Sequence, residues 1–464
     1  MVFSSIPFLY YFLPLVLICY FAVPFRFKNF ILLIFSLVFY SWGEPRYIIL
    51  MVFSIIMAYA EGFLLGKTQG KKAAVVLAAA CCVHIGLLIC FKYADFLIEN
   101  VNAVGGHIPL IKLALPVGIS FYTFQILSYL VDVYRKNCQV QKNLISFGAY
   151  VSMFPQLIAG PIVRYSDIEK QLVYRTHTVD QAALGIRRFM LGMGKKVLLA
   201  NSLGKLCDIF QMTSDPSVLY YWLYAIAFCL QIYFDFSGYS DMAIGLGKIF
   251  GFHFPENFDY PYVSKSIQEF WRRWHMTLGS WFRDYVYIPM GGNRVSKGRW
   301  FFNIATVWFL TGLWHGAAWN FVVWGLMFAV LLLVEKAGFL HFLNRHKIFS
   351  HIYVMLMVAV SFVIFNAADM KEALQYLQVM FTGGNLPFLS QEFLYYLRSY
   401  GVILLLAVVG ATPMIPESIK KLREKKWGNT ILNIVEPIFL VLLFVVITSF
   451  LVNDSYNPFL YFRF

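Results

Sequence analysis

The chain has 464 residues, of which 60% are hydrophobic and only 13% are charged. A soluble protein of this size needs more charged residues to cover its surface, so this composition excludes an ordinary soluble globular protein. The formal net charge is +14, but the basic residues lie in short loops between apolar blocks. That distribution is typical of cytoplasmic loops beside anionic lipid, and it argues against a nucleic-acid partner.

Apolar blocks that approach the roughly 20 residues of a membrane span recur along the chain. In order they are Pro7–Pro24, Phe30–Gly43, Tyr47–Gly66, Ala73–Cys90, Ile352–Phe365, Gly401–Val409 and Ile431–Val452. The sequence therefore predicts an all-α polytopic integral membrane protein, with a single membrane domain over 1–464. The first block has no basic stretch before it and no cleavage site after it, so we expect a retained span.

Basic residues in the loops predict the orientation of the chain. The loops at 25–28, 67–72, 135–142, 336–347 and 420–426 are basic and are expected in the cytoplasm. Counting spans outward from these loops places the amino terminus and the carboxyl terminus outside.

The middle of the chain is less regular. Phe154–Ile162 contains two prolines and a glycine, and Gln231–Gly245 carries Asp235, Ser237 and Asp241 within apolar sequence. Carboxylates at membrane depth are candidate functional groups, here a polar lining. The alternative, which we favour, is that Asp235 and Asp241 cap a broken helix or pair with a nearby arginine.

The segment 265–299 is the most polar stretch of any length and is rich in tryptophan. It is predicted to be an amphipathic cytoplasmic or interfacial element. If Ser266–Phe282 is one helix, Trp271, Trp274 and His275 share a face. A simple interfacial anchor would also explain the tryptophans and arginines, but it does not require His275.

The block 301–335 carries His315 within nearly uncharged sequence, and both of its flanks are basic. We therefore expect it to enter the membrane and return as two short helices with a break near Thr311–Gly316, rather than as one long tilted helix. Imidazole is a natural general base near neutral pH, and Gly316 and Asn320 could admit or orient a ligand. The spacing alone leaves a catalytic His315 and a structural one equally open.

Seven stretches carry a resemblance to a known family. They are Leu115–Gln125, Phe154–Ile162, Tyr233–Gly245, Glu256–Tyr262, Glu269–Arg294, Leu313–Gly325 and Asn457–Phe464. The chain resembles the membrane-bound O-acyltransferase family, and within it the bacterial branch that contains alginate O-acetyltransferase and related polysaccharide O-acetyltransferases. The resemblance implies about 10–12 transmembrane or re-entrant helices around a central tunnel, in the inner membrane of a bacterium.

The resemblance also implies a reaction. His315 matches the family's essential histidine and His275 its second one. No cofactor would be bound; acetyl-CoA would be the cytoplasmic donor, and a separate extracytoplasmic SGNH-type acetyltransferase would place the acetyl group on a polysaccharide. His315 would act as the base, and His275, Asn320 or the backbone N–H of Gly316 would stabilise the oxyanion.

A further set of residues is a candidate for binding the donor: Trp271, Arg272, Arg273, Trp274, Arg283 and Trp314. For the arginines, a plain cytoplasmic charge bias is an equally good explanation. We expect neither a metal site nor a disulfide, because the seven cysteines include no C-x-x-C pair.

Two other functions remain open. The same fold could transfer D-alanine to teichoic acid, although Pro289–Arg294 resembles the acetyl-transferring branch instead. A transporter without covalent chemistry would also show broken helices and buried carboxylates, but the sequence has no internal repeat. The acceptor polymer is not predicted.

Overall fold

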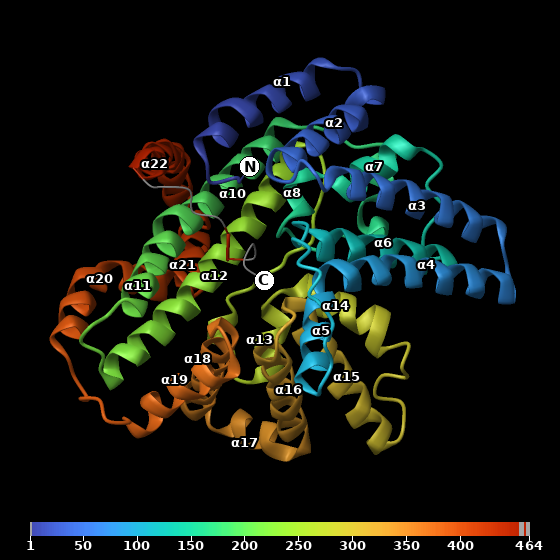
Figure 1. Cartoon of the computed structure of the whole chain (residues 1–464). Coiled ribbons are helices and arrows are strands. Elements are labelled where there is room, and N and C mark those ends of the chain that lie inside the picture. The colour runs from blue at the N-terminus through green and yellow to red at the C-terminus, as the bar shows by residue number, and fades with distance from the viewer. Residues whose placement is uncertain (1, 454–458, 461–464) are drawn as a thin grey trace. The chain divides into compact units, whose positions relative to one another are not determined.

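The computed structural model describes residues 2–453 and 459–460, and within them the chain forms helices and no strands (Figure 1). The all-α prediction is therefore confirmed. The chain divides into two compact units. Unit 1 comprises Met1–Phe189 and Ser240–Glu256, and unit 2 comprises Met190–Tyr239 and Asn257–Phe464. A single membrane domain over the whole chain stays a prediction.

Unit 1 contains the amino-terminal helices. They are η1 (Phe8–Phe12), α1 (Leu13–Ala22), α2 (Phe25–Gly43), α3 (Ile48–Lys67), α4 (Gly70–Lys92), α5 (Ala94–Ala103), α6 (Ile119–Tyr134), α7 (Leu144–Ser152), α8 (Phe154–Leu157) and α9 (Tyr165–Val173). The residues of α10 (Val179–Gly194) and α12 (Val218–Ile249) are divided between the two units.

Unit 2 contains the remaining helices. They are η2 (Lys195–Ala200), α11 (Asn201–Gln211), η3 (Pro261–Val263), α13 (Ile267–Arg273), α14 (Met276–Phe282), η4 (Arg283–Tyr287), α15 (Lys297–His315), α16 (Trp319–Val334), η5 (Glu335–Phe339), α17 (Leu340–Arg345), α18 (Lys347–Asn366), α19 (Met370–Thr382), α20 (Gln391–Gly410), α21 (Met414–Arg423) and α22 (Lys426–Asn453).

Eight helical segments of the described chain are long and apolar enough to cross a membrane. They are α2, α3, α4, α12, the continuous segment from α16 to α17, α18, α20 and α22, and Phe8–Ala22 is a shorter apolar helix. Such a set identifies a multi-pass membrane protein. The expectation of about 10–12 helices counted re-entrant helices as well as full spans. Length and hydropathy do not identify re-entrant helices, so the two numbers cannot be compared directly. The sidedness of the loops and of both termini stays a prediction.

The carboxylates of α12 correct one expectation. A broken helix within Gln231–Gly245 was one of the two alternatives for these carboxylates, but α12 is continuous from Val218 to Ile249. In unit 2, Asp235 forms a buried ion pair with Lys196 and accepts the backbone N–H of Leu460 at 2.9 Å. These partners satisfy the carboxylate without a helix terminus, so the helix has no need to end there.

The carboxylate of Asp241 has its partner within unit 1, where Oδ1 accepts a hydrogen bond from Arg188 Nε at 3.0 Å. Pairing with an arginine, the favoured alternative, is thus correct for Asp241, whereas the partner of Asp235 is a lysine. Ser237 is buried on the same helix. Phe154–Ile162 does contain the expected interruption, because α8 ends at Leu157. Of the motif Asn457–Phe464, only Phe459 and Leu460 lie within the described residues.

The core of unit 2 is aromatic and surrounds the segments that carry both candidate histidines. Among its buried members are Tyr233, Phe270, Trp274, Trp324, Phe328, Phe362 and Phe365, from α12, α13, α16, α18 and the loop after α13. Large rings that pack edge to face hold one another in fixed orientations. The histidines therefore lie in a rigid, apolar environment.

Candidate active site

His315 is the last residue of α15, and the chain turns there. The helices α15 and α16 pack against each other, and the break between them falls directly after His315. One long helix through this block is excluded. The tight turn depends on glycine, because a Cβ on Gly316 would lie 2.1 Å from the Phe321 ring and one on Gly312 would lie 2.4 Å from the Phe321 carbonyl oxygen. The space beside Gly316 is thus filled by Phe321 rather than left for a ligand.

The imidazole of His315 lies among aromatic rings. The residue is 5% exposed, and its ring meets those of Trp314, Trp324 and Phe365 edge-on, at centroid separations of 4.9, 5.0 and 5.3 Å. Three different helices supply these rings: α15, α16 and α18. Such surroundings exclude water and strengthen any electrostatic interaction made by the imidazole.

Asn320 is held by the end of α18. Its Nδ2 donates to the backbone oxygens of Ala367 at 2.9 Å and Ile364 at 3.4 Å. Two carbonyl acceptors identify this end of the side chain as the amide nitrogen. The nitrogen is therefore engaged, and Asn320 is a poor candidate for the oxyanion donor that the sequence suggested.

The second histidine lies where the helix prediction is wrong. Ser266–Phe282 is not one helix: α13 ends at Arg273, α14 begins at Met276, and His275 has a left-handed φ of 44°. The interruption is imposed by Asn257, whose backbone oxygen accepts the Met276 N–H at 3.0 Å. A left-handed conformation in a residue other than glycine is strained, and such strain is common at functional sites.

Asn257 also determines the protonation of His275. Its Oδ1 accepts the Thr277 backbone N–H at 3.3 Å, which identifies this atom as the oxygen, and it lies 3.0 Å from His275 Nδ1. Nδ1 therefore carries the proton, and Nε2 is the acceptor atom of the ring. This segment lies outside the candidate spans, and burial lowers the pKa of His275 to about 3. A neutral ring with an acceptor at Nε2 does not donate to an oxyanion, contrary to one of our expectations.

The indole of Trp314 brings the two histidines into one site. Its ring centroid lies 4.9 Å from that of His315 and 5.9 Å from that of His275. Phe236 of α12 packs edge-on against His275 at 4.6 Å. Trp274, by contrast, stacks on Phe270 and belongs to the core.

Two further tryptophans offer unused donors. The ring of Trp271 packs against Trp324 at 5.7 Å and against Trp308 at 4.7 Å. The buried indole N–H groups of Trp271 and Trp324 have no hydrogen-bond acceptor among the described residues. An unmatched buried donor costs about 1–3 kcal/mol, which a substrate oxygen would offset. The sequence had marked Trp271 as a candidate but not Trp324.

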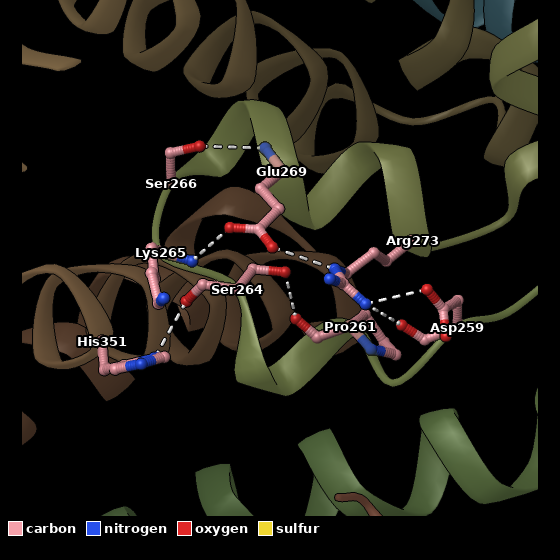
Figure 2. A network of polar contacts seen from close by, with 8 residues as sticks. All are labelled: Asp259, Pro261, Ser264, Lys265, Ser266, Glu269, Arg273 and His351. Carbon is pink, nitrogen blue, oxygen red and sulfur yellow. Dashed lines mark hydrogen bonds and ion pairs between the residues drawn. The ribbon is translucent and has the colours of Figure 1, made fainter. Parts of the chain in front are cut away.

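The three candidate arginines differ in their partners. Figure 2 shows Arg273 between two carboxylates, with Nε 3.1 Å from Glu269 and Nη1 2.8 Å from Asp259. Arg283 is exposed and pairs with the adjacent Asp284. Arg272 is exposed and forms no ion pair with a described residue. Only Arg272 thus has a charge that is not already compensated.

The amino terminus of α13 is capped by a serine hydroxyl and by two carboxylates. Ser266 Oγ accepts the Glu269 N–H at 3.0 Å, and Glu269 in turn accepts the Lys265 N–H at 2.9 Å (Figure 2). The buried Glu335 of η5 accepts the N–H groups of Ile267 and Gln268 at 2.6 and 3.0 Å. Sequence reasoning missed this role, although Glu335 is the first charge after a long uncharged block.

Known proteins resemble the chain over most of its length. It is 42% identical over 395 residues to a protein of Azotobacter vinelandii named probable alginate O-acetylase AlgI, a match that covers 83% of this chain and 79% of that protein. It is 33% identical over 436 residues to the peptidoglycan O-acetyltransferase of Helicobacter pylori, covering 84% and 82%. The teichoic acid D-alanyltransferase of Bacillus subtilis is 30% identical over 239 residues, covering 49% and 60%.

A match to a family model agrees with these relatives and covers both candidate histidines. Residues 136–368 match the model of the membrane-bound O-acyltransferase family, and this range contains both His275 and His315. The chain therefore belongs to the membrane-bound O-acyltransferase family and is a membrane-bound acyltransferase.

Proposed function

We propose that this protein takes an acetyl group from cytoplasmic acetyl-CoA and passes it toward an extracytoplasmic polysaccharide across a bacterial inner membrane. Relatives named for O-acetyl transfer match about four-fifths of the chain, whereas the D-alanyltransferase matches 49% of it. The difference favours acetyl as the group transferred. We place both termini outside, since the basic loops belong in the cytoplasm.

The observation that carries the proposal is the position of His315, buried at the turn between α15 and α16. As a general base, its imidazole takes the proton of the acceptor hydroxyl while that oxygen attacks the thioester carbonyl. The tetrahedral intermediate then expels the thiolate of coenzyme A, and the proton on the imidazole passes to the thiolate. The ester and the free thiol leave, and His315 is neutral again.

We assign the oxyanion donor to the indole of Trp324. Its ring lies against that of His315, and its buried N–H has no acceptor among the described residues. The Asn320 amide is engaged, and His275 is an acceptor at Nε2. Loss of one such donor costs about 10²-fold or more in turnover. A Trp324→Phe protein keeps the ring without the donor, so kcat should fall while KM changes little.

We assign the phosphates of the donor to Arg272, because the charges of Arg273 and Arg283 are compensated. Lys336 lies close enough to Arg272 for their charges to repel each other. Among the described residues neither Arg272 nor Lys336 pairs with a carboxylate, and two adjacent cations of this kind fit a diphosphate. A separate extracytoplasmic SGNH-type acetyltransferase would receive the acetyl group, and membrane lipids surround the protein.

The test uses the full chain in lipid nanodiscs with acetyl-CoA and a soluble hydroxyl acceptor, and it measures release of the coenzyme A thiol. His315→Gln should reduce the rate by about 10²–10⁴-fold, since it removes the base and keeps a polar side chain. His341→Gln, at an exposed position, is the matched control and should behave as wild type. If a well-folded His315→Gln protein turns over normally, His315 is not the base.

The alternative of D-alanyl transfer rests on the weaker match to the teichoic acid enzyme. Supplying carrier-bound D-alanine in place of acetyl-CoA separates the two. Turnover with D-alanine alone would replace our proposal. Membership in an acyltransferase family argues against a transporter without covalent chemistry.

A further inference from the structure

A second group of basic residues lies in unit 1 and takes no part in the proposed reaction. Arg175 follows α9, His177 lies two residues later, and Lys28 is the fourth residue of α2. Arg175 is 4% exposed and Lys28 is 8% exposed. Within the described chain, none of the three forms an ion pair with a carboxylate.

Tyr20 of α1 is the centre of this group. Its hydroxyl donates to the backbone oxygen of Phe250 at 2.8 Å and accepts from Arg175 Nε at 2.9 Å. His177 Nε2 lies 2.9 Å from the same hydroxyl. Lys28 Nζ lies 4.3 Å from the centroid of the Tyr20 ring. Neutral oxygens and aromatic faces thus surround two full positive charges.

The guanidinium of Arg175 is only partly used. Nη1 donates to Asn29 Oδ1 at 2.8 Å and to the Gln171 oxygen at 3.0 Å, and the Phe252 ring covers the group at 4.4 Å. Nη2 is buried and has no acceptor among the described residues. A buried cation with an unmatched donor and no counterion is strongly unfavourable unless an anion completes the site.

The position of the cluster in the fold suggests the source of that anion. Tyr20 lies near the end of α1 and Lys28 near the start of α2, the two apolar helices that pack against each other. The end of an apolar helix in a membrane protein lies at the depth of the lipid headgroups, where lysine and arginine meet phosphates. Phe21, which Lys28 also contacts, is exposed and marks the open side of the cluster.

We propose that Lys28, Arg175 and His177 form a binding site for a phosphate group, and that its occupant is the phosphodiester of an anionic phospholipid. Arg175 Nη2 and Lys28 Nζ each donate to a phosphate oxygen, a charge-assisted interaction for which both groups are suited. The acyl chains extend along the apolar surface of α1 and α2. The site is independent of the proposed acetyl transfer.

The experiment measures binding to the purified full chain in detergent by the shift of its melting temperature. One arm titrates phosphatidylglycerol against phosphatidylcholine, and the other titrates pyrophosphate at constant ionic strength. Lys28→Gln removes a side chain that makes no hydrogen bond among the described residues, so it should fold even if Arg175→Gln does not. Arg26→Gln is the matched control, because Arg26 is exposed, two residues from Lys28, and carries the same charge.

We expect saturable stabilisation by phosphatidylglycerol, weakened about tenfold or more in Lys28→Gln and Arg175→Gln and unchanged in Arg26→Gln. If only pyrophosphate shows this pattern, the phosphate site is supported and its source is soluble rather than lipid. If Lys28→Gln binds both ligands as wild type does, the proposal is overturned. Because no outcome is read from acyl transfer, failure here leaves the catalytic proposal untouched.

Discussion

The α15–α16 hairpin and the α13–α14 segment each carry one histidine of the site, yet they are specified in different ways. The hairpin turns at glycines that adjoin His315 in sequence, and its two helices contact each other directly. The interruption at His275 is made by Asn257, eighteen residues earlier, and α13 is capped by Glu335, more than sixty residues later. A break with local causes can be recognised in sequence, whereas a break with distant causes cannot.

The same contrast separates the chemistry of the two imidazoles. Aromatic rings from three helices surround His315. His275 has a fixed tautomer because a polar side chain holds its Nδ1. His315 is suited to proton transfer in a site without water, and His275 is suited to positioning the Trp314 ring that both histidines contact. Four changes test this division of roles.

The largest effect should come from comparing the two histidines in one mutant cycle. We expect His315→Gln to reduce kcat/KM by about 10²–10⁴-fold and His275→Asn to reduce it less. Asparagine tolerates the left-handed backbone at position 275, so this variant tests the ring rather than the fold. If both act in one site, the double variant should be little worse than His315→Gln. Fully additive losses would show that the two regions act separately.

Gly316→Ala should destabilise the hairpin itself. Its new Cβ would overlap the Phe321 ring, and overpacking of this kind costs about 1–3 kcal/mol. Gly298→Ala, near the other end of α15, is the control, because nothing lies within 4 Å of its Cβ. Thermal unfolding measures both. Equal stability of the two variants would mean that the turn does not depend on the glycine.

Acidification should act on the His275 region. Because its pKa is about 3 in the folded protein and about 6.5 when unfolded, only the unfolded chain gains a proton as the pH falls below 6.5. Stability is therefore complete above pH 6.5 and should fall by about 2 kcal/mol at pH 5.

The control for the pH experiment is His275→Asn, which has no titrating group at this position and should lose that part of the pH dependence. The comparison is made by unfolding at pH 7 and pH 5. An identical decrease in both proteins would assign the acid sensitivity to another group.

Glu335→Gln should have the smallest effect. Glutamine keeps one acceptor oxygen but loses the negative charge at the amino terminus of α13, a change of about 1 kcal/mol. Glu424→Gln, at an exposed position of unit 2, controls for loss of charge. If the two variants unfold alike, the carboxylate does not stabilise α13.

Composition and motifs were enough to identify the class of the protein and the place of its principal histidine. Apolar blocks with few charges specify membrane helices, because each span must be apolar along its own length. The apolar character of a span can therefore be read from that segment alone. The uncharged block 301–335, with glycines beside His315, likewise indicated a hairpin. Motif resemblance then identified the family and both histidines.

The partners of the buried polar groups, by contrast, become apparent only in the folded chain. Lys196 satisfies Asp235, Asn257 fixes the tautomer of His275, and the Asn320 amide holds the end of α18. These partners lie 18 to 47 residues apart and belong to different segments of the chain. Which donor meets which acceptor depends on how distant segments pack. For that reason the polar residues of α12 suggested a break that is absent, and the helical periodicity of Ser266–Phe282 missed the break at His275.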